Sequence, residues 1–256
     1  MLSEIRKISS LLLSVAFSSI GFIASITVTV LAAREVSSNP LFVGFPNAVG
    51  VGGAVLGTRM IYLISKNNSQ LNALAFTFLI GAFGGAIMFY SLIVDSFVLL
   101  LFGAFILGIG QSATLQTRYA ASFVASEKFK ATALSLAVWF SVFGSVFGPR
   151  MVGSYSNFFE NIFNSELIVG YVIALVGMLF AASSLFIFTS KKSILRSPSN
   201  LESESNNQNS NKKNGNLLSL LLVLNHFTMV VIMSATPLHI QDIGETVQLV
   251  GIIISY

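Results

Sequence analysis

The chain alternates long apolar stretches with short polar breaks, and this rhythm constrains its fold more than any other feature. A helix needs about 20 apolar residues to cross a hydrocarbon core about 30 Å thick. Six stretches of that length precede residue 190, at about 8–32, 41–63, 70–93, 97–119, 131–153 and 166–190. A seventh runs over about 216–236, and an eighth opens near residue 247.

These stretches predict membrane-spanning helices rather than soluble helices or membrane strands. Residues 71–94 are apolar or small on every side, whereas a helix at the surface of a soluble core keeps a polar face. Membrane barrels are built from short alternating segments, which these continuous runs do not provide. With 54% hydrophobic residues, 9% charged residues and a mean hydropathy of +0.81, the sequence predicts an all-α polytopic membrane protein whose partner is the lipid bilayer.

The basic residues gather on every second polar break. If the amino terminus is cytoplasmic, only Arg34 and Arg150 of the 14 Lys and Arg residues fall away from the cytoplasmic side. This positive-inside bias predicts a multi-pass protein of the cell membrane with a cytoplasmic amino terminus. The net charge of +4 does not indicate nucleic-acid binding, because the basic residues are not interleaved with aromatic ones along one face.

The residue types argue against an enzyme. There is no cysteine, which excludes a thiolate zinc site and a cysteine nucleophile, and the two histidines lie far from any paired carboxylates. We therefore expect no metal and no cofactor. No acid pair or nucleophile and base converge, and no glycine-lysine phosphate loop occurs, so a membrane enzyme and a nucleotide-driven pump are both disfavoured.

One low-complexity segment divides the chain into three parts. Residues 191–215 are rich in Asn, Ser and Lys and contain no aromatic residue, so they cannot bury enough surface to fold alone. We predict a six-helix bundle over 1–190, a flexible cytoplasmic linker over 191–215 and an incomplete second bundle over 216–256. Because the stretch that opens at residue 247 is too short to cross a membrane, we expect a product truncated within its eighth span.

This layout resembles the major facilitator superfamily of transporters, whose halves each contain two inverted three-span repeats. The resemblance implies a six-helix amino-terminal bundle followed by the seventh helix and the start of the eighth. The fifth stretch contains Gly144, Gly148, Pro149 and Gly153, which are similar to a glycine-proline motif in the fifth span of many exporters of that superfamily. The motif implies a hinge for rocking, but ordinary glycine-mediated packing explains these residues equally well.

A second motif is only partly present. Between its second and third spans the superfamily carries a glycine, an aspartate and several basic residues. Residues 52–70 keep Gly53, Gly57, Arg59 and Lys66 but contain no acidic residue. In the family the acidic residue is thought to help to latch one conformation, so this chain must use another latch or a looser one.

Five polar residues within the spans are candidates for a substrate pathway. Gln111, Thr114 and Arg118 share one helical stripe by their spacing, in a region that resembles the fourth-span arginine region of the superfamily. Arginine at membrane depth is costly unless it faces a watery cavity or extends to the interface, and both alternatives stay open. Asn225 and His226 must likewise face a cavity or hydrogen-bond to a neighbouring helix.

The resemblance implies a secondary active transporter that moves a small solute by alternating access. Its substrate, its direction, export included, and any coupling ion stay open. With no Asp or Glu inside the spans, proton coupling would depend on His226 or on a part of the protein beyond this chain. Ser14, Ser18 and Ser25 either line a cavity or bond to backbone carbonyls. A non-transporting receptor or assembly subunit, or an inactive fragment, is the alternative.

Overall fold

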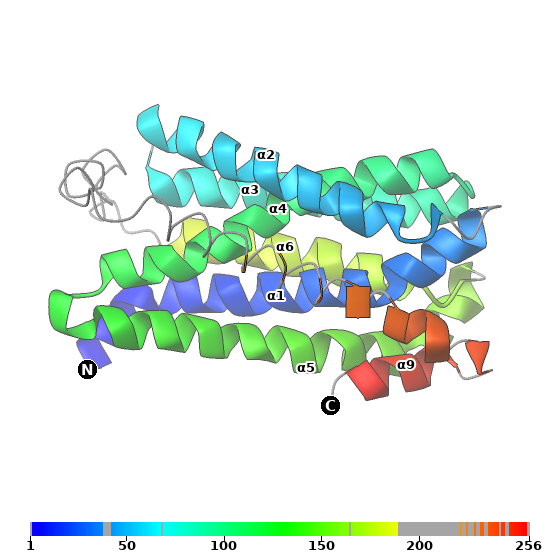
Figure 1. Cartoon of the computed structure of the whole chain (residues 1–256). Helices are drawn as coiled ribbons and strands as arrows, with labels where there is room; N and C mark the ends of the chain where they lie inside the picture. The colour runs from blue at the N-terminus through cyan, green and yellow to red at the C-terminus, as the bar shows by residue number, and fades with distance from the viewer. Residues whose placement is uncertain are drawn as a thin grey trace.

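A computed structural model describes residues 2–37, 42–67, 69–163, 165–188, 221, 224, 228, 231–232, 235–240, 242–243 and 246–254. The labelled elements are α1 (Leu2–Val36), α2 (Phe45–Asn67), α3 (Gln70–Ile93), α4 (Phe97–Val124), the 3-10 turn η2 (Glu127–Phe129), α5 (Lys130–Phe163), α6 (Ile168–Phe188) and α9 (Val247–Ile254). Figure 1 shows the long helices running alongside one another. The predicted all-α fold is confirmed. The linker over 191–215 lies outside the described residues.

Six of the described helices are long and apolar enough to cross a membrane, as the sequence predicts. The bounds of α3 match the predicted stretch, but α4 continues to Val124 and α5 to Phe163, beyond the predicted 119 and 153. Hydropathy marks only the apolar part of a helix, whereas backbone hydrogen bonding continues through Ser, Asn and Tyr. Arg118 consequently lies six residues inside the end of α4, about 9 Å along its axis.

The contacts between helices have the symmetry that two inverted three-helix repeats would produce. The most extensive contacts join α1 to α5 and α6, α4 to α2 and α3, and α3 to α6. If α1, α2 and α3 are exchanged with α4, α5 and α6, the pair α1 and α5 becomes α4 and α2. The pair α1 and α6 likewise becomes α4 and α3. The arrangement therefore agrees with the repeats that the family resemblance implies.

Glycines occupy the same crossings in both repeats. Where α3 crosses α4, a Cβ added to Gly81 would lie 2.7 Å from the Cα of Gly110. At the equivalent crossing of α6 and α1, a Cβ added to Gly177 would lie 3.1 Å from the Cα of Gly21. Two helix backbones approach this closely only where side chains are absent, and such contacts hold membrane helices together through dispersion.

The outer helices α2 and α5 use glycine in the same way. On α2, Gly53 and Gly57 pack against the backbone of α4, and on α5, Gly144 and Gly148 pack against the backbone of α1. The opposite faces of these two helices carry exposed apolar side chains such as Trp139, which is 65% exposed. In a bilayer those faces would contact lipid or another helix.

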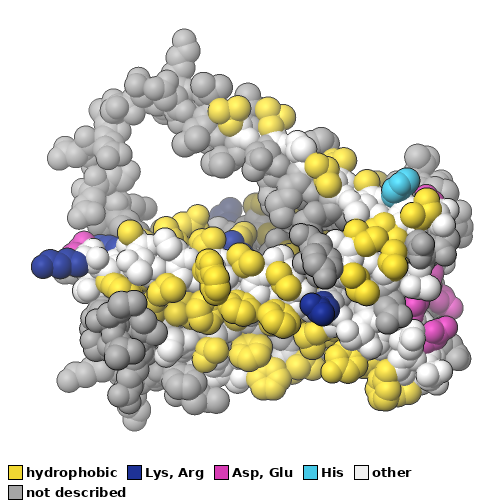
Figure 2. Space-filling model, turned by 90° about the horizontal axis from the view of Figure 1, so that it is seen from below, with side chains coloured by type: hydrophobic (Ala, Val, Ile, Leu, Met, Phe, Trp, Pro, Cys, Tyr) yellow, Lys and Arg dark blue, Asp and Glu magenta, His cyan; other side chains and the backbone are white. Residues whose placement is uncertain are grey.

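The two ends of the bundle carry opposite charges. We call the end with Lys66, Lys128 and Lys130 the basic end. The opposite, acidic end carries the last turn of α1 and α5 and the turns before α4 and α6, with Glu35, Asp95, Glu160 and Glu166. Figure 2 shows hydrophobic side chains over the middle of one face, with most of the visible Asp and Glu atoms at one end.

Ser14, Ser18 and Ser25 of α1 form hydrogen bonds to backbone carbonyls within the packed bundle. The hydroxyl of Ser14 donates to the carbonyl of Ala181 on α6 at 3.2 Å, while Ser18 and Ser25 donate to carbonyls of their own helix. All three side chains are buried. The structure therefore favours the backbone-bonded alternative over a cavity-lining role for these residues.

The glycine crossings generate a test by substitution. Gly81→Ala should lower the free energy of unfolding by about 1–3 kcal/mol, because its Cβ would force the backbones of α3 and α4 apart. The measurement is the midpoint of SDS-induced unfolding in mixed micelles, followed by helical ellipticity at 222 nm. Gly52→Ala is the matched control, since nothing lies within 4 Å of its Cβ position. It should be neutral or stabilising by up to about 1 kcal/mol, and equal losses in both variants would contradict the packing role.

Candidate functional site

The predicted stripe on α4 lies on one continuous helix. Thr114 is buried at 3% exposure, and Gln111 and Arg118 are partly buried. The same side of α4 also carries exposed Leu115 and Tyr119 in its basic-end half, so the stripe borders an uncovered face of the described bundle. Asn225 and His226 lie outside the described residues, and their place in a substrate pathway stays a prediction.

Two polar atoms of the stripe are enclosed without a hydrogen-bond partner among the described residues, namely Thr114 Oγ1 and Arg118 Nε. The other buried threonines behave differently. Their hydroxyls donate to the carbonyl four residues earlier, as seen at Thr27, Thr29, Thr77 and Thr117. A buried polar group without a partner costs about 1–3 kcal/mol, so this part of α4 carries unused hydrogen-bonding capacity.

The glycine-proline motif of α5 faces two different partners. Gly144 and Gly148 contact α1 within the bundle. Pro149 and Gly153 contact α9, where a Cβ added to Gly251 would collide with the carbonyl oxygen of Pro149 and lie 2.9 Å from the amide nitrogen of Gly153. All four motif residues therefore make close packing contacts, and a hinge role stays a prediction.

The partial motif before α3 lies mostly within α2. Gly53, Gly57 and Arg59 are helical, and only residues 68 and 69 separate α2 from α3. The two glycines pack on α4, while Arg59 and Lys66 are exposed. The helical positions give these glycines a packing role, and a latching role for the basic residues stays a prediction.

An ion pair that the sequence analysis missed closes the acidic end. Arg34 Nη1 of α1 lies 2.6 Å from Oδ1 of Asp242, which follows the helical residues 235–240. The partners are 208 positions apart, so no local pattern could pair them. The available signal was that Arg34, with Arg150, departs from the positive-inside pattern and precedes acidic Glu35. Together with the contact at Gly251, this ion pair ties the segment after residue 235 to the first bundle.

A shallow groove on α5 offers no polar chemistry. Its lining is Trp139, Val142, Phe143, Val146 and Phe147, all of them apolar. Three of these rings form a ladder, with Trp139 edge-on to Phe143 and Phe143 stacked on Phe147. Among the described residues no group of three His, Asp or Glu side chains could hold a metal ion.

Several carboxylates lie close to one another at the acidic end. Glu35 lies near enough to Glu166 and Asp95 for their charges to repel it. In the turn before α6, burial raises the pKa of the Glu166 carboxyl, and the charge of Glu160 raises it further. The ionised form of Glu166 is therefore less favourable in the folded protein than in the unfolded chain.

This shift predicts a pH-dependent effect of Glu166→Gln. Above the folded-state pKa the native carboxylate is ionised at a cost, so the variant should be more stable than the wild type near neutral pH. The advantage should shrink as the pH falls through the folded-state pKa and vanish where both states are protonated. Thermal unfolding between pH 4 and pH 8 measures it. Glu127→Gln, at the basic end and paired with Lys130, is the control and should give no such gain.

Comparison with known proteins gives two curated relatives. The uncharacterized MFS-type transporter YdeG of Bacillus subtilis is 27% identical over 254 residues, which cover 95% of this chain and 59% of that protein. The uncharacterized MFS-type transporter YddS of the same organism is 27% identical over 260 residues, with 97% and 60% covered. The chain thus spans about three fifths of the length of these relatives. No family model and no solved structure matches. The chain is therefore similar to MFS-type transporters, and the pairing of its six long helices agrees with its resemblance to the major facilitator superfamily.

Proposed function

We propose that this chain forms the larger part of a secondary active transporter that moves a small solute across the cell membrane by alternating access. The main support for this proposal is that two groups of helices meet at the acidic end, through the ion pair of Arg34 with Asp242 and through the packing of Gly251 of α9 against α5. Both curated relatives are named as MFS-type transporters, and that name points to transport without enzymatic chemistry.

The charges of the two ends support an orientation. The basic end contains the start of α1 and α5, and basic residues favour the cytoplasmic side. The amino terminus would then be cytoplasmic and the acidic end external. In this orientation the described contacts close the pathway on its external side.

The contacts at the acidic end are weak enough to break and form again. Arg34 and Asp242 are 47% and 56% exposed, and an ion pair at such a surface contributes at most about 1 kcal/mol. The contact between Gly251 and Gly153 involves no interlocking side chains, so one backbone can slide on the other. Two weak contacts of this kind hold one conformation without preventing the other. They would also hold one conformation in place of the acidic residue that the superfamily carries between its second and third spans, which segment 52–70 lacks.

Transport itself is measured with the whole product of the gene in proteoliposomes. We expect at least one of a panel of radiolabelled carboxylates, phosphate esters, amines and sugars to exchange with saturation, at least tenfold faster than in protein-free liposomes. Protein that is folded and inserted, yet exchanges none of them, would favour the alternative of a receptor or an assembly subunit.

Cross-linking tests the latch. Residues 1–256 contain no cysteine, so Arg34→Cys with Asp242→Cys supplies the only two thiols of this part of the protein. A reducible bifunctional methanethiosulfonate should join them and slow exchange at least tenfold, and reduction should restore the rate. Glu35→Cys with Asp95→Cys is the matched control, because both residues belong to the first bundle. Unchanged exchange after complete joining of residues 34 and 242 would contradict the latch.

A further inference from the structure

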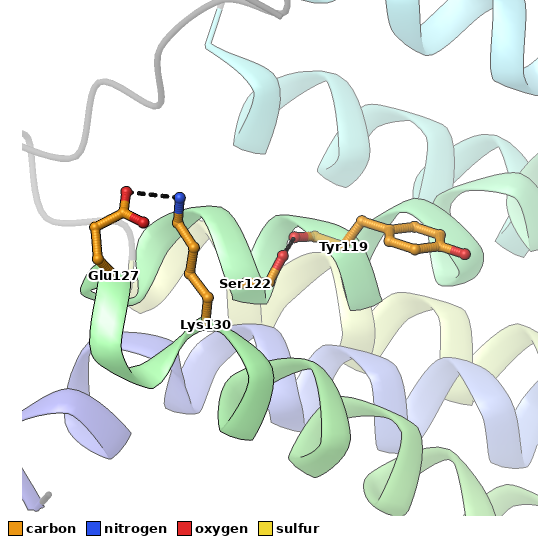
Figure 3. A network of polar contacts seen from close by, with 4 residues as sticks. All are labelled: Tyr119, Ser122, Glu127 and Lys130. Carbon is orange, nitrogen blue, oxygen red and sulfur yellow. Dashed lines mark hydrogen bonds and ion pairs between the residues drawn. The ribbon is translucent and has the colours of Figure 1, made fainter. Parts of the chain in front are cut away.

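Lys130 and Arg118, two of the cations near the basic end, lie in different electrostatic environments. Lys130 Nζ lies 2.7 Å from Glu127 Oε1, so its charge is balanced locally. Figure 3 shows this pair beside the end of α4, where the hydroxyl of Ser122 donates to the carbonyl oxygen of Tyr119. Arg118 lies on the same stretch of α4, and among the described residues no carboxylate pairs with it.

The environment of Arg118 explains why the missing partner matters. Its Nε atom is enclosed by protein and has no acceptor among the described residues, although the side chain as a whole is partly exposed. An enclosed N–H donor without an acceptor loses its hydration and gains nothing in exchange. Arg118 thus lies at the border between packed protein and the exposed face of α4, and its Nε has no acceptor in the described part of the chain.

Thr114 adds a second donor one helical turn away. Its Oγ1 is enclosed and has no partner among the residues that the structure describes, whereas the buried hydroxyl of Thr117 on the same helix donates to the carbonyl of Ala113 at 2.7 Å. Spacing by four residues places Thr114 and Arg118 on the same side of α4. A guanidinium and a hydroxyl in this arrangement match a group with two acceptor oxygens and a negative charge.

We propose that Arg118 and Thr114 bind an oxyanion, either a carboxylate or a phosphate. This deepens the proposed function by naming the chemical class of solute that the transporter would take at this site. The same chemistry is also offered by the phosphate of an anionic lipid headgroup, because Arg118 lies about 9 Å from the basic end of α4. Both sources require the same two donors and are separable by experiment.

The test measures binding without transport, so its outcome is independent of the transport assay. The 256-residue chain is purified in a neutral detergent, and its Tm is followed by ellipticity at 222 nm. Sodium acetate and inorganic phosphate are titrated against sodium chloride at equal ionic strength. A second series compares nanodiscs of phosphatidylcholine with nanodiscs that contain phosphatidylglycerol.

We expect the Tm to rise by about 4 °C when the concentration of free oxyanion is ten times its Kd. A rise with acetate or phosphate identifies a free solute, and a rise only with phosphatidylglycerol identifies a lipid headgroup. Arg118→Gln should abolish the rise. Arg118→Lys keeps the charge but loses the fork geometry, so the apparent Kd should increase about tenfold. Thr114→Val should increase the Kd about fivefold.

Arg59→Gln is the matched control, because Arg59 is an exposed arginine in the same half of the bundle. It should keep the full response. The proposal is overturned if acetate, inorganic phosphate and phosphatidylglycerol all leave the Tm of the wild type unchanged. It is also overturned if Arg118→Gln responds like the wild type, or if Arg59→Gln loses the response equally. The lysine and valine variants preserve size and packing, so the test holds even if Arg118→Gln fails to fold.

Discussion

Close approach of helix backbones at glycine is the constraint on which the rest of this structure depends. Lipid chains are as apolar as the helix surfaces, so burial of apolar side chains gives little reason for the helices to associate. Dispersion contacts between backbones supply that reason, and they require positions without a Cβ. The contacts of Gly81 with Gly110 and of Gly177 with Gly21 provide them at equivalent crossings of the two repeats. The pairing of α1, α3, α4 and α6 follows from these contacts.

The same contacts leave the outer helices available for a second bundle. Because α2 and α5 each use one glycine face against α4 or α1, their other faces stay open. At the acidic end part of this open surface of α5 meets Gly251 of α9, and the nearby pair of Arg34 and Asp242 adds an electrostatic contact. A rigid bundle and a weak contact at the acidic end are the two physical components that a rocking mechanism requires.

The polar residues of the bundle divide into two groups. Most buried hydroxyls bond to backbone carbonyls and contribute only to packing, as at Ser25 and Thr77. A few residues break this rule, since each keeps an enclosed atom without a partner in the described part of the chain; Thr114 and Arg118 share one side of α4, and the others are Ser19, Ser69, Ser165 and Tyr171. In a protein interior such atoms are destabilising, which makes them better markers of a ligand than polarity alone.

The sequence by itself determined the six spanning helices before residue 190, their approximate bounds and the all-α class, because each depends on hydropathy and spacing along one helix. It also placed Gln111, Thr114 and Arg118 on one stripe. It did not show that Gly53 and Gly57 pack against α4, that Gly153 meets α9, or that Arg34 pairs with Asp242. Those contacts join residues far apart in the chain, and only the packing of helices against one another brings them together.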